Sequence, residues 1–317
     1  MSQVSYAPQN YLGWTHFVRE NLLPREPSVW HWNAIASSAM PWSLDSFKDR
    51  FPQREIILDD MEEERVVLRE YLEEIQSALN AGKTVSSVRY LKNVWLKHSF
   101  SELVEEICLP PFLKENLLTH PLLSNVVPEV WSPWIELFIS APGTRYPAVH
   151  VDRWMTHAWL MQVFGEKCFY LWPPRHRGLN DLQHTYKDDD TRAMRLRNAQ
   201  LSIGIDDETP LGSLFEHAMP IALHVNANQA VFVPAGWWHT AQSVTSSITL
   251  SGNFVSSDNF EDFLAAMRMN CDENEATLRN DNDSSAYLKE CTDMIHQFEK
   301  LRPLAHTKLE HLIELLG

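Results

Sequence analysis

Two histidines and one aspartate in this sequence have the types and spacing of a metal site. His150 and Asp152 lie two residues apart in the run AVHVD, which reads as a β-strand, so both side chains would project from the same face. His239 follows an apolar run that is interrupted at Pro234 by a predicted turn. Two histidines and a carboxylate can occupy one face of an octahedral metal, which favours Fe(II). A tetrahedral catalytic zinc uses the same ligand types, so the residues alone leave both metals open.

A lysine at the start of an apolar strand is the second feature with chemical meaning. Lys167 belongs to the run KCFYLWPP, in which no acidic residue alternates with it. Burying an ammonium group is costly unless the charge is paired. A dicarboxylic cosubstrate would supply the partner, with a keto-acid end on the metal and its far carboxylate on the lysine. The alternative is a lysine whose charged end reaches solvent at the mouth of the barrel.

Short strands must carry these residues. They follow one another closely and alternate apolar with polar residues, a pattern typical of a β-barrel or a double-sheet jelly roll such as the cupins. The sequence therefore predicts a mainly β core, a barrel or a jelly roll, with helical flanks at both ends. The predicted strands are WIELFIS, AVHVD, AWLMQVF, KCFYLWPP, IALHV, AVFVPA, HTAQSV and SITLSGNFV.

Three regions follow from the change in periodicity along the chain. Residues 1–83 form an N-terminal helical flank, residues 84–255 the β core, and residues 256–317 a C-terminal helical appendage. A polar insert of the core spans about residues 175–220. Within the flanks, the spacing of apolar residues predicts helices over 43–51 and 60–79, and a polar linker over 271–283.

Composition and charge exclude several classes of protein. The chain has 317 residues and a net charge of −15, so its overall field repels phosphate backbones and disfavours a nucleic-acid partner. Its four cysteines form no C-x-x-C pair, which favours reduced thiols. The first residues lack the pattern of a secretory signal, and no apolar run is long enough to span a membrane. We therefore expect a soluble protein in the cytoplasm, with no membrane partner.

Two stretches carry a resemblance to a known family. HVDRWMTHAWLMQVFGEKCFYLWPP and NANQAVFVPAGWWHTAQSVTSSITLSGNFV resemble the JmjC-type, cupin-like (cupin-8) oxygenases that depend on Fe(II) and 2-oxoglutarate. Within that family, the pattern is similar to the hydroxylase branch and to its phosphatidylserine-receptor-like lysyl hydroxylases. The resemblance runs from about residue 84 to residue 255. It implies a double-stranded β-helix enzyme that uses Fe(II), 2-oxoglutarate and O2.

The resemblance also implies roles for single residues. His150, Asp152 and His239 match the iron ligands, and Lys167 matches the residue that holds the far carboxylate of 2-oxoglutarate. The remaining predicted cosubstrate contacts are Tyr90, Thr156, Ser251 and Asn253.

Two positions depart from the family pattern. Leu160 stands where the related group has an asparagine, and Pro147 stands where it has a pocket threonine. Both positions concern cosubstrate contacts and neither is a metal ligand.

The sequence favours hydroxylation of a C–H bond on an amino-acid side chain of a protein or peptide. The alternatives are N-methyl-lysine demethylation by the same oxidant and a metal-binding cupin without oxygenase activity. The acidic runs 188–190 and 206–208 would steer a basic substrate toward the mouth of the barrel.

We also expect a homodimer through the C-terminal helices, because a closed barrel has limited room for two further apolar stripes. These stripes are Phe260, Phe263, Leu264 and Met267, and Leu309, Leu312, Ile313 and Leu316.

Overall fold

A computed structural model of the chain describes most of its residues. The described ranges are 4–6, 11–37, 39–59, 64–80, 90–110, 113, 116–123, 135–174, 202–206, 208–214, 219–278 and 282–314. Most of the predicted insert, including the acidic run 188–190, lies outside them.

The larger of two main sheets holds seven strands, and most of its neighbouring strands are antiparallel. A bulge in the outermost strand β5 shifts the register between Leu91 and Val94, and Asn93 there has a φ of 55°. The strand order is β1 (Val4–Tyr6), β2 (Ser28–His31), β12 (Gln229–Val233), β8 (His157–Phe164), β14 (Ser247–Phe254), β6 (Glu136–Ser140) and β5 (Leu91–Trp95).

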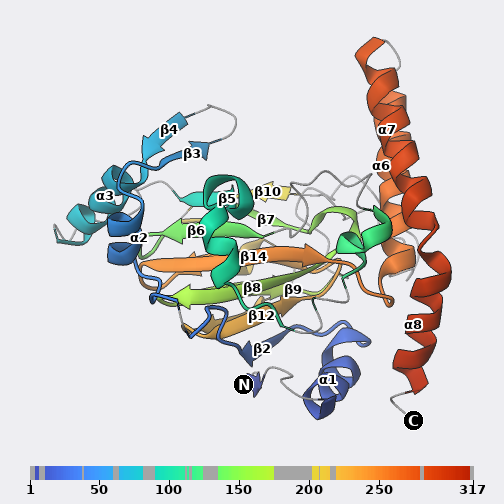
Figure 1. Cartoon of the computed structure of the whole chain (residues 1–317), viewed down its shortest axis with the longest axis horizontal. Coiled ribbons are helices and arrows are strands. Elements are labelled where there is room, and N and C mark those ends of the chain that lie inside the picture. The colour runs from blue at the N-terminus through green and yellow to red at the C-terminus, as the bar shows by residue number, and fades with distance from the viewer. Residues whose placement is uncertain are drawn as a thin grey trace.

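The smaller sheet holds five antiparallel strands and packs against the larger one. Apolar side chains of both sheets, among them Val231 and Phe169, meet in one buried cluster. Two sheets that pack face to face around one core form the predicted double-stranded β-helix, which is therefore confirmed (Figure 1). The order is β10 (Ser202–Gly204), β7 (Ala148–His150), β13 (Trp238–Ser243), β9 (Lys167–Trp172) and β11 (Ile221–Val225).

The N-terminal flank contributes helices and also strands. β1 and β2 extend the larger sheet, so this sheet includes residues before the predicted start of the core. The helix predicted over 43–51 is present as α2 (Leu44–Arg50), with Ser43 as its N-cap. The helix predicted over 60–79 is wrong at its start, because β4 (Glu64–Val67) pairs with β3 (Glu55–Asp59) and only α3 (Leu68–Asn80) is helical.

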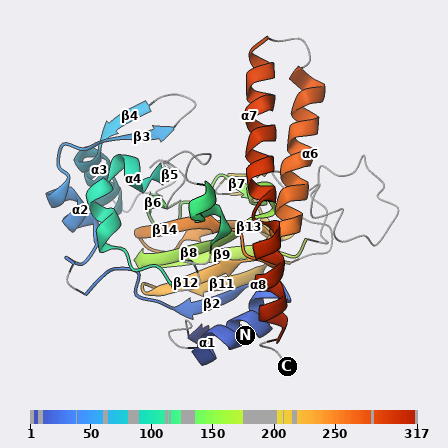
Figure 2. The ribbon, with the colours of Figure 1, turned by 45° about the vertical axis from the view of Figure 1, so that its right-hand side comes forward.

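Helices lie at both ends of the sheets, and α1 (Tyr11–Phe17) lies below β2 (Figures 1 and 2). α2, α3 and the β3–β4 hairpin lie at one end, and the C-terminal helices rise beside the other (Figures 1 and 2). The helices not yet given are η1 (Val18–Leu22), into which α1 continues, α4 (Leu96–Ser99), the short helices η3 (Ser101–Glu106), η5 (Leu117–Thr119), η6 (Pro121–Leu123), η8 (Arg153–Met155) and η10 (Leu211–Ser213), and α6 (Phe260–Leu278), α7 (Asn282–Glu299) and α8 (Arg302–Glu314).

The C-terminal helices pack on the chain itself. The α6 stripe, with Phe260, Phe263 and Leu264 fully buried, meets Leu117 of η5 and Phe298 of α7. Most of this apolar surface is therefore covered within one chain. None of the helices in the described ranges combines the length and the apolar character that crossing a membrane requires.

Candidate functional site

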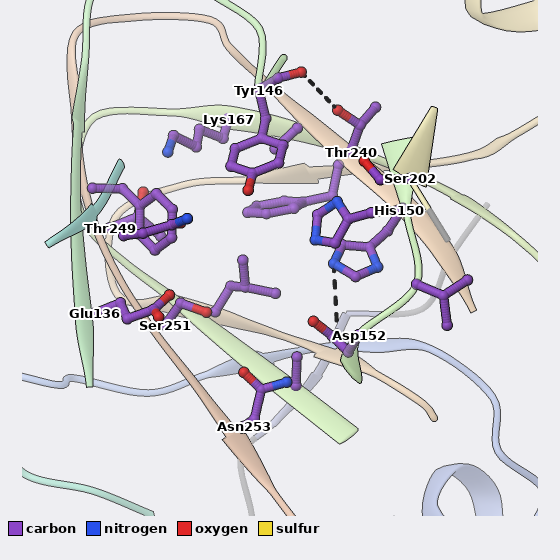
Figure 3. Close-up of a pocket in the computed structure, with 18 of the residues that line it drawn as sticks. Glu136, Tyr146, His150, Asp152, Lys167, Ser202, Thr240, Thr249, Ser251 and Asn253 are labelled. Atoms are coloured by element: carbon purple, nitrogen blue, oxygen red, sulfur yellow. Dashed lines mark hydrogen bonds and ion pairs between the residues drawn. The ribbon is translucent and has the colours of Figure 1, made fainter. Parts of the chain in front are cut away.

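The three predicted metal ligands lie together. β7 carries His150, Asp152 follows it, and β13 carries His239, which is in register with His150. One ligand atom from each of the three residues lies within 4.8 Å of the others. Nε2 of His239 is 3.8 Å from Oδ2 of Asp152, and the centres of the two imidazole rings are 4.3 Å apart (Figure 3). Pairing of β7 with β13 thus brings together residues that lie far apart in the sequence.

The surroundings of the two histidines suit metal binding. Nδ1 of His239 lies 3.2 Å from the carbonyl oxygen of Trp237, which can only accept a hydrogen bond, so Nδ1 is the donor and Nε2 is the nitrogen that faces Asp152. Burial, with a further contribution from the His239 ring, lowers the pKa of His150 well below its usual value. A neutral imidazole is the form that coordinates a metal.

The donor set fits iron. Two imidazoles from neighbouring strands and the carboxylate that follows β7 are the ligand types of a non-haem Fe(II) site, and imidazole with carboxylate binds iron well. The buried Nδ1 of His150 makes no well-formed hydrogen bond within the described part of the chain. These residues would hold the metal from one side of the cavity described next.

A cavity of about 290 Å³ opens beside the three residues. Figure 3 shows Lys167 on the far side of this cavity from His150 and Asp152. Side chains of β14, β6, β9 and β13 form its walls, so both sheets contribute. Its lining includes Tyr90, Asn93, Glu136, Phe138, Tyr146, His150, Asp152, Arg153, Leu160, Lys167, Thr240, Thr249, Ser251 and Asn253.

Lys167 is the most buried charged group of the cavity. Its side chain is almost fully buried, and Nζ donates a hydrogen bond of 2.7 Å to the hydroxyl of Tyr90. Nζ also lies 5.0 Å from the ring centre of Tyr90 and 5.8 Å from that of Phe138. Burial lowers the pKa of Lys167 to about 7. The ammonium therefore lies inside the barrel, which disfavours the alternative of a lysine that reaches solvent.

The other predicted contacts divide into two groups. Tyr90, Ser251 and Asn253 line the cavity. Thr156 is buried next to it, where its hydroxyl donates to the carbonyl of Arg153 and accepts from Nδ2 of Asn253 over 2.8 Å. Any influence of Thr156 on the cavity therefore passes through Asn253.

The two departures from the family pattern also have different positions. Leu160 lines the cavity, whereas Pro147 does not.

Several further lining residues were not predicted, among them Tyr146, Glu136 and Asn93. Tyr146 lies on His150, with 5.0 Å between ring centres, and its alternation with His150 and Asp152 was a signal in the sequence. Glu136 is the charged residue of the strand ELFIS, which was also a signal. The sequence gave no signal for Asn93, because the bulge that accommodates this residue in β5 depends on pairing with β6.

Comparison with known proteins identifies the family of the chain. Residues 43–260 match the cupin-like domain family. The human 2-oxoglutarate and iron-dependent oxygenase JMJD4 is 25% identical over 205 residues, which is 62% of this chain and 44% of the human protein. The bifunctional arginine demethylase and lysyl-hydroxylase psr-1 of Caenorhabditis elegans is 23% identical over 175 residues, 50% of this chain and 37% of that protein.

A plant protein is similar over a comparable part of the chain. The lysine-specific demethylase JMJ21 of Arabidopsis thaliana is 26% identical over 160 residues, 50% of this chain and 16% of its own length. The chain thus spans less than half the length of each of these three relatives. The family match covers most of the chain, including the three metal ligands and Lys167. As the resemblance to the JmjC-type oxygenases predicted, the chain belongs to the cupin-like domain family.

Proposed function

We propose that this protein is an iron- and 2-oxoglutarate-dependent oxygenase that hydroxylates a C–H bond of an amino-acid side chain in a protein or peptide. One observation carries the proposal: the group of His150, Asp152 and His239 faces the buried Lys167 across a single cavity. A metal at one end and a cation at the other suit a dicarboxylate that has a keto acid at one end.

Each residue has a role in this proposal. His150, Asp152 and His239 hold the iron, and Lys167 with Tyr90 binds the far carboxylate of 2-oxoglutarate. When bound, iron and 2-oxoglutarate supply the oxidising chemistry, in which O2 delivers one oxygen atom to the C–H bond and the other to succinate, with release of CO2. The protein orients the cosubstrate, and Leu160 and Phe138 line an apolar wall that limits water.

Turnover of 2-oxoglutarate tests the proposal. The purified chain, given Fe(II), 2-oxoglutarate and O2 together with a peptide library or a lysate, should form succinate and add one oxygen mass to a substrate. A cupin that only binds metal would form no succinate under any of these conditions. That result would reject the oxygenase proposal.

Demethylation is the second candidate, because the relatives psr-1 and JMJ21 are named as demethylases. Hydroxylation of an N-methyl group gives an unstable product that releases formaldehyde, so both reactions use the same oxidant. Incubation with matched methylated and unmethylated peptides separates them. A stable mass gain on the unmethylated peptide supports hydroxylation, and formaldehyde from the methylated peptide supports demethylation.

A basic substrate is the preferred class. The chain carries a net charge of −15, and the carboxylate side chain of Glu136 lines the cavity next to Ser251 (Figure 3). A carboxylate there attracts a lysine or arginine side chain as it enters. Glu136→Gln should lower the catalytic efficiency on a basic peptide but not on a neutral one, and raised salt should reduce the difference. An equal effect on both peptides would reject this role.

A homodimer and a cytoplasmic location complete the proposal. For the dimer, α8 offers the exposed Ile313, whereas the α6 stripe is buried within the chain and is not available to a partner copy. The molar mass from light scattering tests the dimer, and a monomer would reject it.

For the location, the free thiols of Cys108, Cys168, Cys271 and Cys291 suit a reducing compartment, and imaging of a tagged chain is the test.

A further inference from the structure

The loop that leads to the metal ligand His239 is anchored from outside the cavity. Nε1 of Trp237 donates a hydrogen bond of 2.9 Å to the backbone carbonyl of Arg25, near the start of the chain. The carbonyl of Trp237 in turn lies 3.2 Å from Nδ1 of His239. A short path of hydrogen bonds therefore joins Arg25 to the imidazole that would coordinate the metal.

The side chain of Arg25 fixes the backbone that makes this contact. Its guanidinium donates to Oδ2 of Asp262 over 2.7 Å and to the carbonyl of Asp258 over 2.9 Å, and its Nε lies 3.6 Å from Oδ2 of Asp258. Its φ of 57° is in the left-handed region, which a non-glycine residue keeps only when its surroundings hold it. The two carboxylates of the α6 region supply that constraint.

A second anchor holds the same loop two residues earlier. The backbone N–H of Ala235 donates to Nδ1 of the fully buried His157 over 2.9 Å, and Nε2 of His157 lies 3.2 Å from Asp258. Burial by itself raises the pKa of Asp258, but His157 and Arg25 outweigh it and hold that pKa below its usual value. A charged Asp258 thus joins both anchors of the loop.

We infer that Arg25, held by Asp258 and Asp262, is a positioning residue for the metal ligand His239 and acts through Trp237. Groups that orient a ligating histidine set its tautomer and its direction, and their loss weakens metal binding. The inference rests on the proposed iron site. Its readout is metal affinity rather than turnover, so it can be tested without a substrate.

The test is a double-mutant cycle with Mn(II) alone as the probe. Trp237→Phe removes the indole donor but keeps an aromatic ring, and Arg25→Lys keeps the charge but loses the planar set of donors. The control is Arg302→Gln in α8, which breaks a half-exposed ion pair with Glu261 of α6 and lies outside the network. The concentration of free Mn(II), measured by electron paramagnetic resonance, gives the dissociation constant of each full-length variant.

Each single variant should bind Mn(II) about tenfold more weakly than the wild type. The double variant should bind no more weakly than the weaker single variant, because both changes interrupt one path. The control should bind like the wild type.

Additive losses in the double variant, or an unchanged affinity in a folded Trp237→Phe variant, would overturn the inference. If Arg25→Lys does not fold, Trp237→Phe alone decides, since it leaves the ion pairs of Arg25 intact. If the wild-type chain binds no Mn(II), both the proposed function and this inference are overturned. If the wild type binds Mn(II) but the variants do not differ from it, only the positioning role fails.

Discussion

The ammonium group of Lys167 donates a hydrogen bond of 2.7 Å to the hydroxyl of Tyr90, a residue 77 positions earlier in the chain. Lys167 begins β9 of the smaller sheet, and Tyr90 immediately precedes β5 of the larger one, so the bond joins the two sheets at the cavity. Within the described ranges no carboxylate forms an ion pair with Lys167. The hydroxyl satisfies one of the three donors of the ammonium and leaves the charge for an anion that enters the cavity.

Replacing Lys167 by alanine should weaken 2-oxoglutarate binding without loss of the metal. A hydrogen bond to a charged group contributes about 1.5–3 kcal/mol, which corresponds to roughly ten- to a hundredfold in affinity. Calorimetric titration of the Mn(II)-loaded protein with 2-oxoglutarate measures the effect. Lys300→Ala, at an exposed lysine, is the matched control. An unchanged affinity in the Lys167 variant would remove the main support for the cosubstrate assignment.

Replacing Tyr90 by phenylalanine should have a smaller effect in the same direction. The change keeps the ring that lies 5.0 Å from Nζ of Lys167 and removes only the hydroxyl. A neutral hydrogen-bond partner contributes about 0.5–1.5 kcal/mol, so we expect a roughly two- to tenfold loss of 2-oxoglutarate affinity. The same titration tests it. A loss as large as that of Lys167→Ala would instead mean that Tyr90 carries most of the binding.

The binding of 2-oxoglutarate should take up protons above pH 7. Burial lowers the pKa of Lys167 to about 7, so in the cosubstrate-free protein the lysine loses its proton as the pH rises through that value. A bound carboxylate favours the charged form and raises this pKa, so the affinity falls between about pH 7 and the higher pKa of the complex. Titrations at pH 8 in two buffers of different ionisation enthalpy measure the uptake. Lys167→Met should abolish it, and uptake that persists in that variant would assign it to another group.

The same pKa makes a prediction for folding without cosubstrate. Because the lysine pKa is lower in the folded than in the unfolded chain, the unfolded chain binds more protons between about pH 7 and the ordinary lysine pKa of about 10.4. The contribution of Lys167 to the free energy of unfolding therefore rises with pH in that window. Urea unfolding at several pH values, compared with Lys167→Met, isolates it. Parallel curves for the two proteins would contradict the prediction.

Removal of either histidine ligand should abolish activity and leave the fold. In His150→Ala and in His239→Ala, two remaining ligands cannot keep the metal in its open geometry, so Fe(II)-dependent formation of succinate should stop. Mn(II) should raise the melting temperature of the wild type but not of either variant, because a ligand stabilises only the state that binds it. His224→Ala, at an exposed histidine of β11, is the control. Retained turnover in either ligand variant would reject the assignment.

The sequence alone determined the parts of this protein that depend on local pattern. The two-residue spacing of His150 and Asp152 is enough to predict that both side chains point to one side, although β7 ends at His150, and the runs of short strands are enough to predict a mainly β core of the barrel or jelly-roll type. The cost of a charge in an apolar strand is likewise enough to single out Lys167. Each of these conclusions needs only neighbouring residues.

The tertiary structure decided the rest, because the partners lie far apart in the chain. Residues 64–67 carry a helical pattern but form β4, since pairing with β3 supplies their backbone hydrogen bonds. α6 continues to Leu278, through residues predicted as a linker, and packs beside α7. The periodicity of the sequence does not predict the hydrogen-bonded path from Arg25 through Trp237 to His239. Only folding brings a backbone carbonyl near the start of the chain to an indole beside the metal site, and long-range contacts of this kind leave no local signal.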